Sequence, residues 1–242
     1  MIPAFNEKER LSSFLFNLTE EISKSNLNGE IIIVDDGSRK DDYRYYLNII
    51  SRLNNASVRI LRHPRNMGKG AAIKTGFKDA KGTWIGFVDA DGAISSKEVM
   101  RLLKIALSST DLDGIFGSRV MMLGYNIDRK FMRHLGGRIL TTLLYFFLRI
   151  PVYDSQCGYK IFRASKILPL INICKEQGYL LDLELITIGY RNKLNFLEVP
   201  ISWKDIPGGK VNLMIDGWKM LMGLWRIRKR LITMDIKSVS KI

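Results

Sequence analysis

Three short motifs occur in order along the chain: MIPAFNE at residues 1–7, VDDGS at residues 34–38 and DADG at residues 89–92. Each motif places acidic or turn-forming residues directly after an apolar stretch. In an open parallel sheet, the carboxyl ends of the strands bring such side chains to one edge. Three strand ends that carry carboxylates, rather than a glycine-rich fingerprint, predict a nucleotide that is held in part through a divalent cation.

The segments between the motifs alternate between strand-like and helix-like spacing. Strands are predicted at residues 31–34, 58–61, 83–88, 113–116 and 196–203, and helices at residues 11–22, 41–53, 67–80 and 95–107. This alternation is typical of an α/β fold with a mostly parallel, twisted sheet flanked by helices. Only Met1 and Ile2 precede Pro3, so we expect a shortened first strand, with lower stability and weaker nucleotide affinity than in a chain extended upstream.

Length and charge restrict the function without deciding it. The 242 residues suit one domain, which we place at residues 1–230, followed by a basic tail at residues 231–242. The net charge of +14 favours nucleic acid, an anionic membrane or phosphorylated ligands as partners. The two cysteines and two histidines lack the spacing of a disulfide scaffold or a zinc site.

Two segments have the composition of a membrane interface. The apolar run at residues 139–148 is flanked by Arg138 and Arg149 and is about half the ~20 residues that a spanning helix needs. A basic helix is predicted from residue 213. Its apolar face is formed by Met214, Trp218, Leu221, Met222 and Trp225, and its basic stripe by Lys219, Arg226 and Arg230. This helix suits either a membrane surface or packing on the sheet with its basic edge in water.

The carboxylate pair Asp89 and Asp91 is the central chemical feature. A pair at a strand end can hold Mg²⁺ or Mn²⁺, which neutralises the charge of a departing diphosphate. An ordinary turn in which Asp91 caps the next helix is the structural alternative. The same motif also resembles the first motif of haloacid-dehalogenase-type phosphatases, in which Asp89 would be a nucleophile. That family places its motif early and a further acidic pair late, and this sequence has the opposite order.

The three motifs together resemble family 2 glycosyltransferases of the GT-A fold, and most of all the polyprenyl-phosphate sugar transferases. The string DSQCGYK at residues 154–160 is similar to that of dolichyl-phosphate glucosyltransferase-like proteins. NMGKG at residues 66–70, LDLE at residues 181–184 and EVPISW at residues 198–203, followed by GGKV at residues 208–211, match further family segments, although Gly209 stands where the family usually has Ser. The resemblance extends from residue 1 to about residue 230.

The resemblance implies roles for individual residues. The nucleotide sugar would contact Pro3, Phe5, Glu7, Val34, Asp36, Lys69, Asp89, Ala90, Asp91 and Lys210. The catalytic set would be Asp91, Arg119, Asp182 and Lys210, with Asp89 and Asp91 as metal ligands. Arg119, Arg133 and Arg138 would bind the acceptor phosphate, since an arginine fork suits a phosphate oxyanion.

These roles predict an inverting transfer of a hexose from a nucleoside diphosphate sugar to a polyprenyl or dolichyl phosphate. UDP-glucose is the expected donor, and GDP-mannose or a hydroxyl acceptor are the alternatives. We expect Mg²⁺ or Mn²⁺ as cofactor, and peripheral attachment to an anionic membrane at its cytoplasmic face. A basic nucleic-acid-binding protein is the non-enzymatic alternative. The acidic strand ends argue against that function, because they repel a phosphate backbone.

Overall fold

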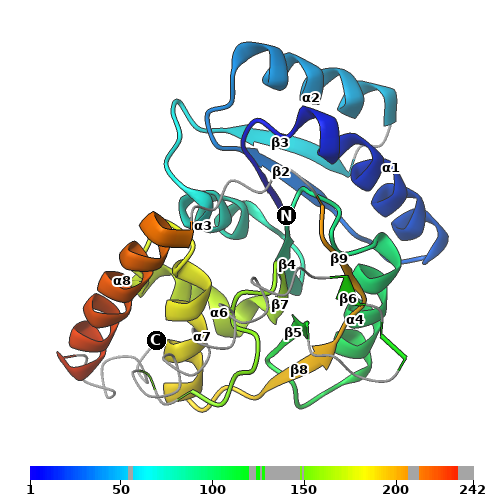
Figure 1. The fold of residues 1–242 in the computed structure, drawn as a ribbon. Helices are drawn as coiled ribbons and strands as arrows, with labels where there is room; N and C mark the ends of the chain where they lie inside the picture. Colours follow the sequence, from blue (N-terminus) through cyan, green and yellow to red (C-terminus); the bar gives the residue numbers. More distant parts are fainter. Residues whose placement is uncertain are drawn as a thin grey trace.

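The computed structural model describes residues 1–53, 57–119, 124–125, 127–128, 148, 150–206 and 213–233, and it has the α/β architecture that the sequence predicts (Figure 1). The strands are β1 (Ile2–Ala4), β2 (Ile31–Asp35), β3 (Val58–Arg62), β4 (Trp84–Val88), β5 (Gly114–Ser118), β6 (Ile127–Asp128), β7 (Tyr159–Arg163), β8 (Phe196–Pro200) and β9 (Trp203–Lys204). The helices are α1 (Lys8–Lys24), α2 (Lys40–Leu53), α3 (Lys69–Asp79), α4 (Ser96–Ser108), α6 (Ala164–Ile173), α7 (Leu181–Arg191) and α8 (Leu213–Thr233).

The central strands form two groups that meet edge to edge. In one group, β1, β2 and β3 are parallel neighbours, and in the other the order is β4-β7-β5-β8. Strand β7 runs antiparallel to both β4 and β5, whereas β5 and β8 are parallel. The backbone N–H of Val88 in β4 donates to Met1 O at 3.1 Å and so joins the two groups. Strand β1 includes Pro3 and Ala4, and it therefore extends beyond the residues that the sequence analysis assigned to it.

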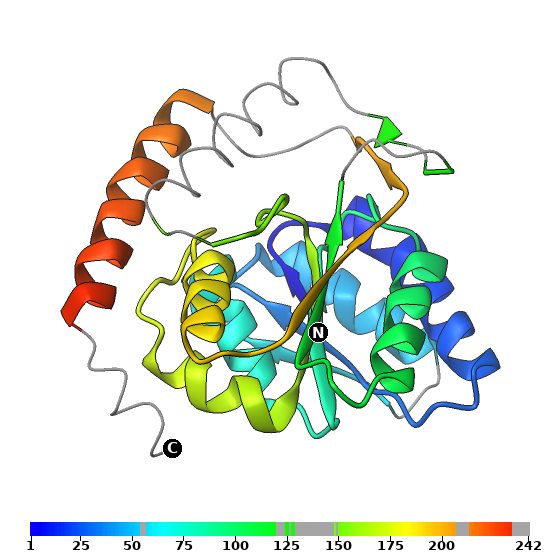
Figure 2. The ribbon, with the colours of Figure 1, turned by 90° about the horizontal axis from the view of Figure 1, so that it is seen from below.

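Both faces of the sheet are covered, which explains the nearly continuous apolar strands. Helices α1, α2 and α4 pack on one face through Leu11, Tyr46 and Leu102. On the other face, α3, α6, α7 and α8 pack on a group of phenylalanines from the strands and α3, namely Phe77, Phe87, Phe116 and Phe162. Figure 2 shows α8 as the outermost layer on this side.

Four elements in the second half of the chain were predicted differently or not at all. Elements β7, α6 and α7 were not predicted as a strand and two helices. Helix α8 continues to Thr233, past the predicted domain end at residue 230, because Leu231 is buried in the core. Most of residues 139–148 lie outside the described part, although Leu148 itself is buried with the α7 and α8 side chains. In the described part of the chain, no helix is long and apolar enough to cross a membrane.

Candidate active site

The carboxyl ends of the strands gather the charged residues that the sequence singled out. Asp36 follows β2, Asp89 follows β4 and Arg119 follows β5, while Lys69 begins helix α3. The charge of Asp89 acts on the pKa values of Lys69, Asp91 and Arg119, so these groups share one electrostatic environment. The predicted clustering of these residues at one sheet edge is therefore present in the structure.

The predicted carboxylate pair lies beside a lysine. Lys69 Nζ is 2.5 Å from Asp89 Oδ1 and 5.4 Å from the centre of the Phe87 ring. The backbone N–H of Asp89 donates to Gly158 O at 3.0 Å, which fixes the start of the turn. Asp91 Oδ1 accepts the N–H of Ala93 at 3.0 Å across Gly92, whose φ of 70° suits glycine. Ala90 between the two carboxylates is buried.

The Asp89–Asp91 pair fits a hard divalent cation. Burial, and then the charge of Asp89, raise the pKa of the Asp91 carboxyl, so the two groups repel each other when both are ionised. A cation would relieve that repulsion. No group of three or more His, Cys, Asp or Glu side chains suited to a metal is found among the described residues. Two carboxylates with coordination positions left for phosphate oxygens and water are a typical donor set for Mg²⁺.

Arg119 is held by the carboxylate of Asp154, for which the sequence predicted no role. Its Nε and Nη2 donate to Asp154 Oδ2 and Oδ1 at 2.7 and 2.8 Å. Burial works against the charged guanidinium, but Asp154 outweighs it and raises the pKa of Arg119. Glu198 in turn accepts the backbone N–H groups of Tyr153 and Asp154 at 2.8 and 2.6 Å. The expected phosphate ligand is thus oriented by a bidentate ion pair.

Asp182 is held by a fully buried lysine. Lys160 Nζ donates to Asp182 Oδ2 at 3.0 Å and to Cys157 O at 2.6 Å, and it lies 5.4 Å from the centre of the Phe87 ring. Asp182 is at the start of α7, where the positive end of the helix dipole favours a carboxylate. Lys69 and Lys160 both contact Phe87, so this ring lies between the Asp89 and Asp182 ion pairs.

Two of the residues predicted to line the nucleoside pocket also have structural roles. The Val34 side chain is completely buried in the core, and its contact with a nucleotide stays a prediction. Asp36 is buried, and its carboxylate accepts the N–H groups of Met67 and Gly68 at 2.9 and 2.8 Å. His63 Nδ1 lies 2.7 Å from Asp36 Oδ1. Asp36 therefore shapes the loop that presents Lys69.

Other predicted residues lie near the same edge or outside the described part of the chain. Pro3 pairs with Val34 in the sheet, and Phe5 follows β1 with its side chain half-buried. Glu7 is the N-cap residue of α1 and forms an ion pair with Arg10, whose charge also reaches Asp91. Arg133, Arg138 and Lys210 lie outside the described residues.

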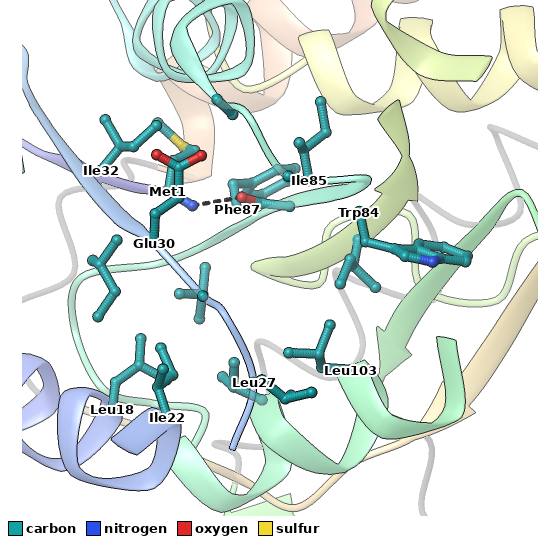
Figure 3. A pocket seen from close by; sticks show the side chains of 18 of the residues that line it. Met1, Leu18, Ile22, Leu27, Glu30, Ile32, Trp84, Ile85, Phe87 and Leu103 are labelled. Atoms are coloured by element: carbon teal, nitrogen blue, oxygen red, sulfur yellow. Dashed lines mark hydrogen bonds between the residues drawn. The ribbon is translucent and has the colours of Figure 1, made fainter. Parts of the chain in front are cut away.

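A cavity of about 700 Å³ lies away from these charged groups. Its walls include Leu18, Leu27 and Trp84, near the amino ends of β2 and β4 (Figure 3). None of the predicted site residues that the structure describes lines this cavity. The chemistry predicted from the motifs therefore belongs to the opposite end of the strands.

Comparison with family models gives a match over residues 1–168 to the family described as "Glycosyl transferase family 2". The protein "Dolichyl-phosphate beta-glucosyltransferase" of Saccharomyces cerevisiae is 35% identical to this chain over 246 residues, covering 94% of this chain and 73% of that protein. The Homo sapiens protein with the same description is 25% identical, and the match covers 95% of this chain and 77% of that protein.

Solved structures resemble the fold at lower identity. Glucosyl-3-phosphoglycerate synthase from Mycobacterium tuberculosis in complex with UDP has a TM-score of 0.65 at 15% identity, covering 94% of this chain and 76% of that chain. The same enzyme with Mn²⁺, UDP-glucose and phosphoglyceric acid also has a TM-score of 0.65 at 15% identity, with 94% and 77% covered. This likeness confirms the predicted fold class.

Proposed function

This chain belongs to glycosyl transferase family 2 and, within it, to the dolichyl-phosphate β-glucosyltransferases, and on that premise we propose that it transfers glucose from UDP-glucose to a polyprenyl phosphate such as dolichyl phosphate. The observation that carries the proposal is the Asp89–Asp91 carboxylate pair beside Lys69 at the carboxyl edge of the sheet. Transfer of glucose from the donor requires negative charge to be neutralised where the diphosphate departs. This edge supplies two carboxylates that can hold a divalent cation, and a lysine ammonium beside them.

On the donor side, Asp89 and Asp91 would hold Mg²⁺ or Mn²⁺. The bound cation would supply Lewis-acid stabilisation of the departing diphosphate. Lys69, at the first turn of α3, would contact a phosphate, because the helix dipole also favours an anion there. Phe5 and Pro3 lie at the end of β1, where an aromatic or proline face can pack on the uracil ring.

On the acceptor side, the nucleophile is a phosphate oxygen that is already ionised near neutral pH. Such an acceptor needs positioning more than a strong base, and Arg119, fixed by Asp154, would orient it. Attack in line with the departing UDP inverts the anomeric carbon, in agreement with the "beta" in the relatives' description. Arg133, Arg138 and Lys210 are retained as proposed phosphate ligands from the family resemblance alone.

Asp182 has a different proposed role with this acceptor. Its carboxylate accepts a hydrogen bond from the buried Lys160 ammonium at 3.0 Å, which fixes its position. A general base is required when the acceptor is a hydroxyl, and a phosphate acceptor does not need one. We therefore assign Asp182 to positioning the acceptor side of the site rather than to proton abstraction.

A lipid acceptor also requires the site to reach a membrane surface. Leu221, Met222 and Trp225 of α8 expose apolar side chains next to basic residues of the same helix. Trp and basic side chains together favour the headgroup region of a bilayer. We propose that α8 attaches the enzyme peripherally to an anionic membrane, on the cytoplasmic face.

The test uses the purified chain, vesicles that contain dolichyl phosphate, and labelled UDP-glucose or GDP-mannose. We expect label in the extracted lipid from UDP-glucose, and its loss with EDTA. Asp91→Ala should lower transfer by on the order of 10³-fold, which corresponds to about 4 kcal/mol of barrier. Asp111→Ala, which removes an exposed aspartate elsewhere, is the matched control. Transfer that persists in EDTA, or that uses only GDP-mannose, would contradict the proposal.

A further inference from the structure

Lys69 occupies the position that a cation needs. Its ammonium is 2.5 Å from Asp89 Oδ1, with side-chain exposures of 22% for Lys69 and 36% for Asp89. The other carboxylate oxygen, Oδ2, faces backbone: a Cβ added at Gly158 would lie only 2.1 Å from it. A cation that binds Asp89 must therefore approach Oδ1, where it would meet the Lys69 ammonium. Two positive charges on one carboxylate oxygen repel each other.

The Lys69 ammonium can change partner because its side chain is partly exposed and only the backbone at its base is held. The base of the side chain is fixed, because Asp36 holds the N–H groups of Met67 and Gly68 directly before it. The flexible stem can therefore swing while the loop stays in place.

We propose that Lys69 is a built-in counter-ion of Asp89, which the divalent cation displaces and which the diphosphate of the donor then receives. This inference rests on the proposed function and deepens it. Without nucleotide, a cation must break the Lys69–Asp89 ion pair and hold two positive charges close together. With nucleotide bound, the diphosphate accepts the ammonium, so that cost is removed. Lys69 thereby couples the binding of metal and donor, and the coupling is reciprocal.

The experiment measures Mn²⁺ affinity directly, by the electron paramagnetic resonance signal of free Mn²⁺, with and without UDP. Without UDP, we expect Lys69→Met to bind Mn²⁺ about tenfold more tightly than the original chain, a size typical of coupled sites. UDP should then raise the Mn²⁺ affinity of Lys69→Met about tenfold less than it raises that of the original chain. Lys69→Arg keeps the charge and should retain the weak nucleotide-free binding.

The matched control is Lys74→Met, which removes the same charge from the same helix. Lys74 donates to Cys174 O at 2.6 Å and does not contact Asp89. Its Mn²⁺ affinity should equal that of the original chain. If Lys69→Met fails to fold by circular dichroism, Lys69→Gln makes the same comparison.

Each result bears on one proposal only. Nucleotide-free Mn²⁺ affinity that is unchanged or weaker in folded Lys69→Met overturns the counter-ion role, even if the original chain transfers glucose. A tenfold gain that Lys74→Met shares equally also overturns it, because the effect would then be a general one of charge. An original chain that binds Mn²⁺ but neither binds UDP nor transfers glucose refutes the proposed function instead.

Discussion

Gly158 and Asp89 are in such close contact that the identity of one residue fixes the position of the other. The N–H of Asp89 donates to Gly158 O, and the Asp89 carboxylate lies where a side chain of residue 158 would begin. Glycine is needed here for close approach, not for an unusual backbone angle. The string at residues 154–160 thus shapes the proposed metal site without supplying a proposed ligand.

The first prediction follows from that contact. Gly158→Ala places a methyl group 2.1 Å from Asp89 Oδ2, so the carboxylate must move. Displacement of a reacting group by about 1 Å costs on the order of 100-fold in rate. We expect glucose transfer to fall by that factor and Mn²⁺ affinity to weaken. Gly178→Ala, where the added Cβ meets nothing within 4 Å, is the control. Equal activity of the two variants would contradict the role of Gly158.

The second prediction concerns the cost of keeping two carboxylates together. The pKa of Asp91 is raised in the folded protein, so its ionisation destabilises the fold as pH rises through that pKa. Asp91→Asn should therefore abolish transfer but raise the melting temperature by a few degrees in EDTA at pH 7. The gain should shrink as the pH falls and Asp91 becomes protonated in the original chain. An unchanged or lower melting temperature at pH 7 would contradict the repulsion.

The sequence predicted which ionisable groups lie at the sheet edge better than it predicted their ion-pair partners. Asp89, Asp91 and Lys69 were predicted because each follows a strand or begins a helix at the same edge. The ion pairs of Arg119 with Asp154 and of Lys160 with Asp182 join residues 35 and 22 positions apart in the chain. Only the fold brings such groups together. The complete burial of the Val34 side chain was likewise not apparent from the sequence, because a core position and a pocket position share the same sequence neighbourhood.

The loop that connects α6 and α7 contacts both helix α8 and the start of helix α3. Glu176 in this loop accepts Arg226 of α8 at 3.1 Å and also forms an ion pair with Arg230. Its neighbour Gln177 accepts the N–H of Ala71 at 3.0 Å, at the start of α3. The proposed membrane helix is therefore connected through one loop to the segment that presents Lys69.

The third prediction tests that connection. Glu176→Gln weakens the contacts to Arg226 and Arg230, which are 52% and 31% exposed, so the effect should be modest. Loss of about 0.5–1 kcal/mol of ion-pair free energy should raise the KM for UDP-glucose about two- to fivefold. The control is Glu20→Gln, which removes an exposed ion pair with Lys24 on α1. A KM that matches the control would show that the loop does not transmit the position of α8.

The alternating strands and helices up to β5 were predicted with small errors at their ends. Helix α4 begins after Ser95, the N-cap residue, whose side chain accepts the N–H of Glu98 at 3.3 Å. Strand β7 was missed because it includes a charged residue, Lys160, whose complete burial the sequence does not reveal. Its antiparallel pairing with β4 and β5 is fixed by contacts distant in sequence. Helix α7 was not predicted because residues 181–184 were interpreted only as an acidic family motif.

The whole molecule has a net charge of +14, which is far more than Lys69, Arg119 and Lys160 at the carboxyl edge of the sheet supply. Basic residues elsewhere on the molecule are therefore available for other contacts. Helix α8 forms the outer layer on one side of the sheet (Figure 2). Its exposed apolar residues Leu221, Met222, Trp225 and Ile232 lie beside Lys229, whose Nζ is 5.5 Å from the centre of the Trp225 ring. Apolar and basic groups on one outer helix favour an anionic bilayer surface.

The last prediction is that the protein binds anionic vesicles peripherally, with an affinity that falls as salt rises, and binds neutral vesicles weakly. Each basic residue near the surface contributes about 1 kcal/mol at low salt. Replacing Met222 and Trp225 by Ser should weaken vesicle binding by about tenfold or more, because each buried apolar side chain contributes about 1.5–3 kcal/mol. The same variant should transfer less glucose to long-chain acceptors and still hydrolyse UDP-glucose, because the donor edge is intact. Phe16→Ser removes a comparably exposed aromatic residue from α1 and should leave vesicle binding unchanged. Equal binding to neutral and anionic vesicles, insensitive to salt, would mean that the basic surface of this molecule meets a partner other than the membrane.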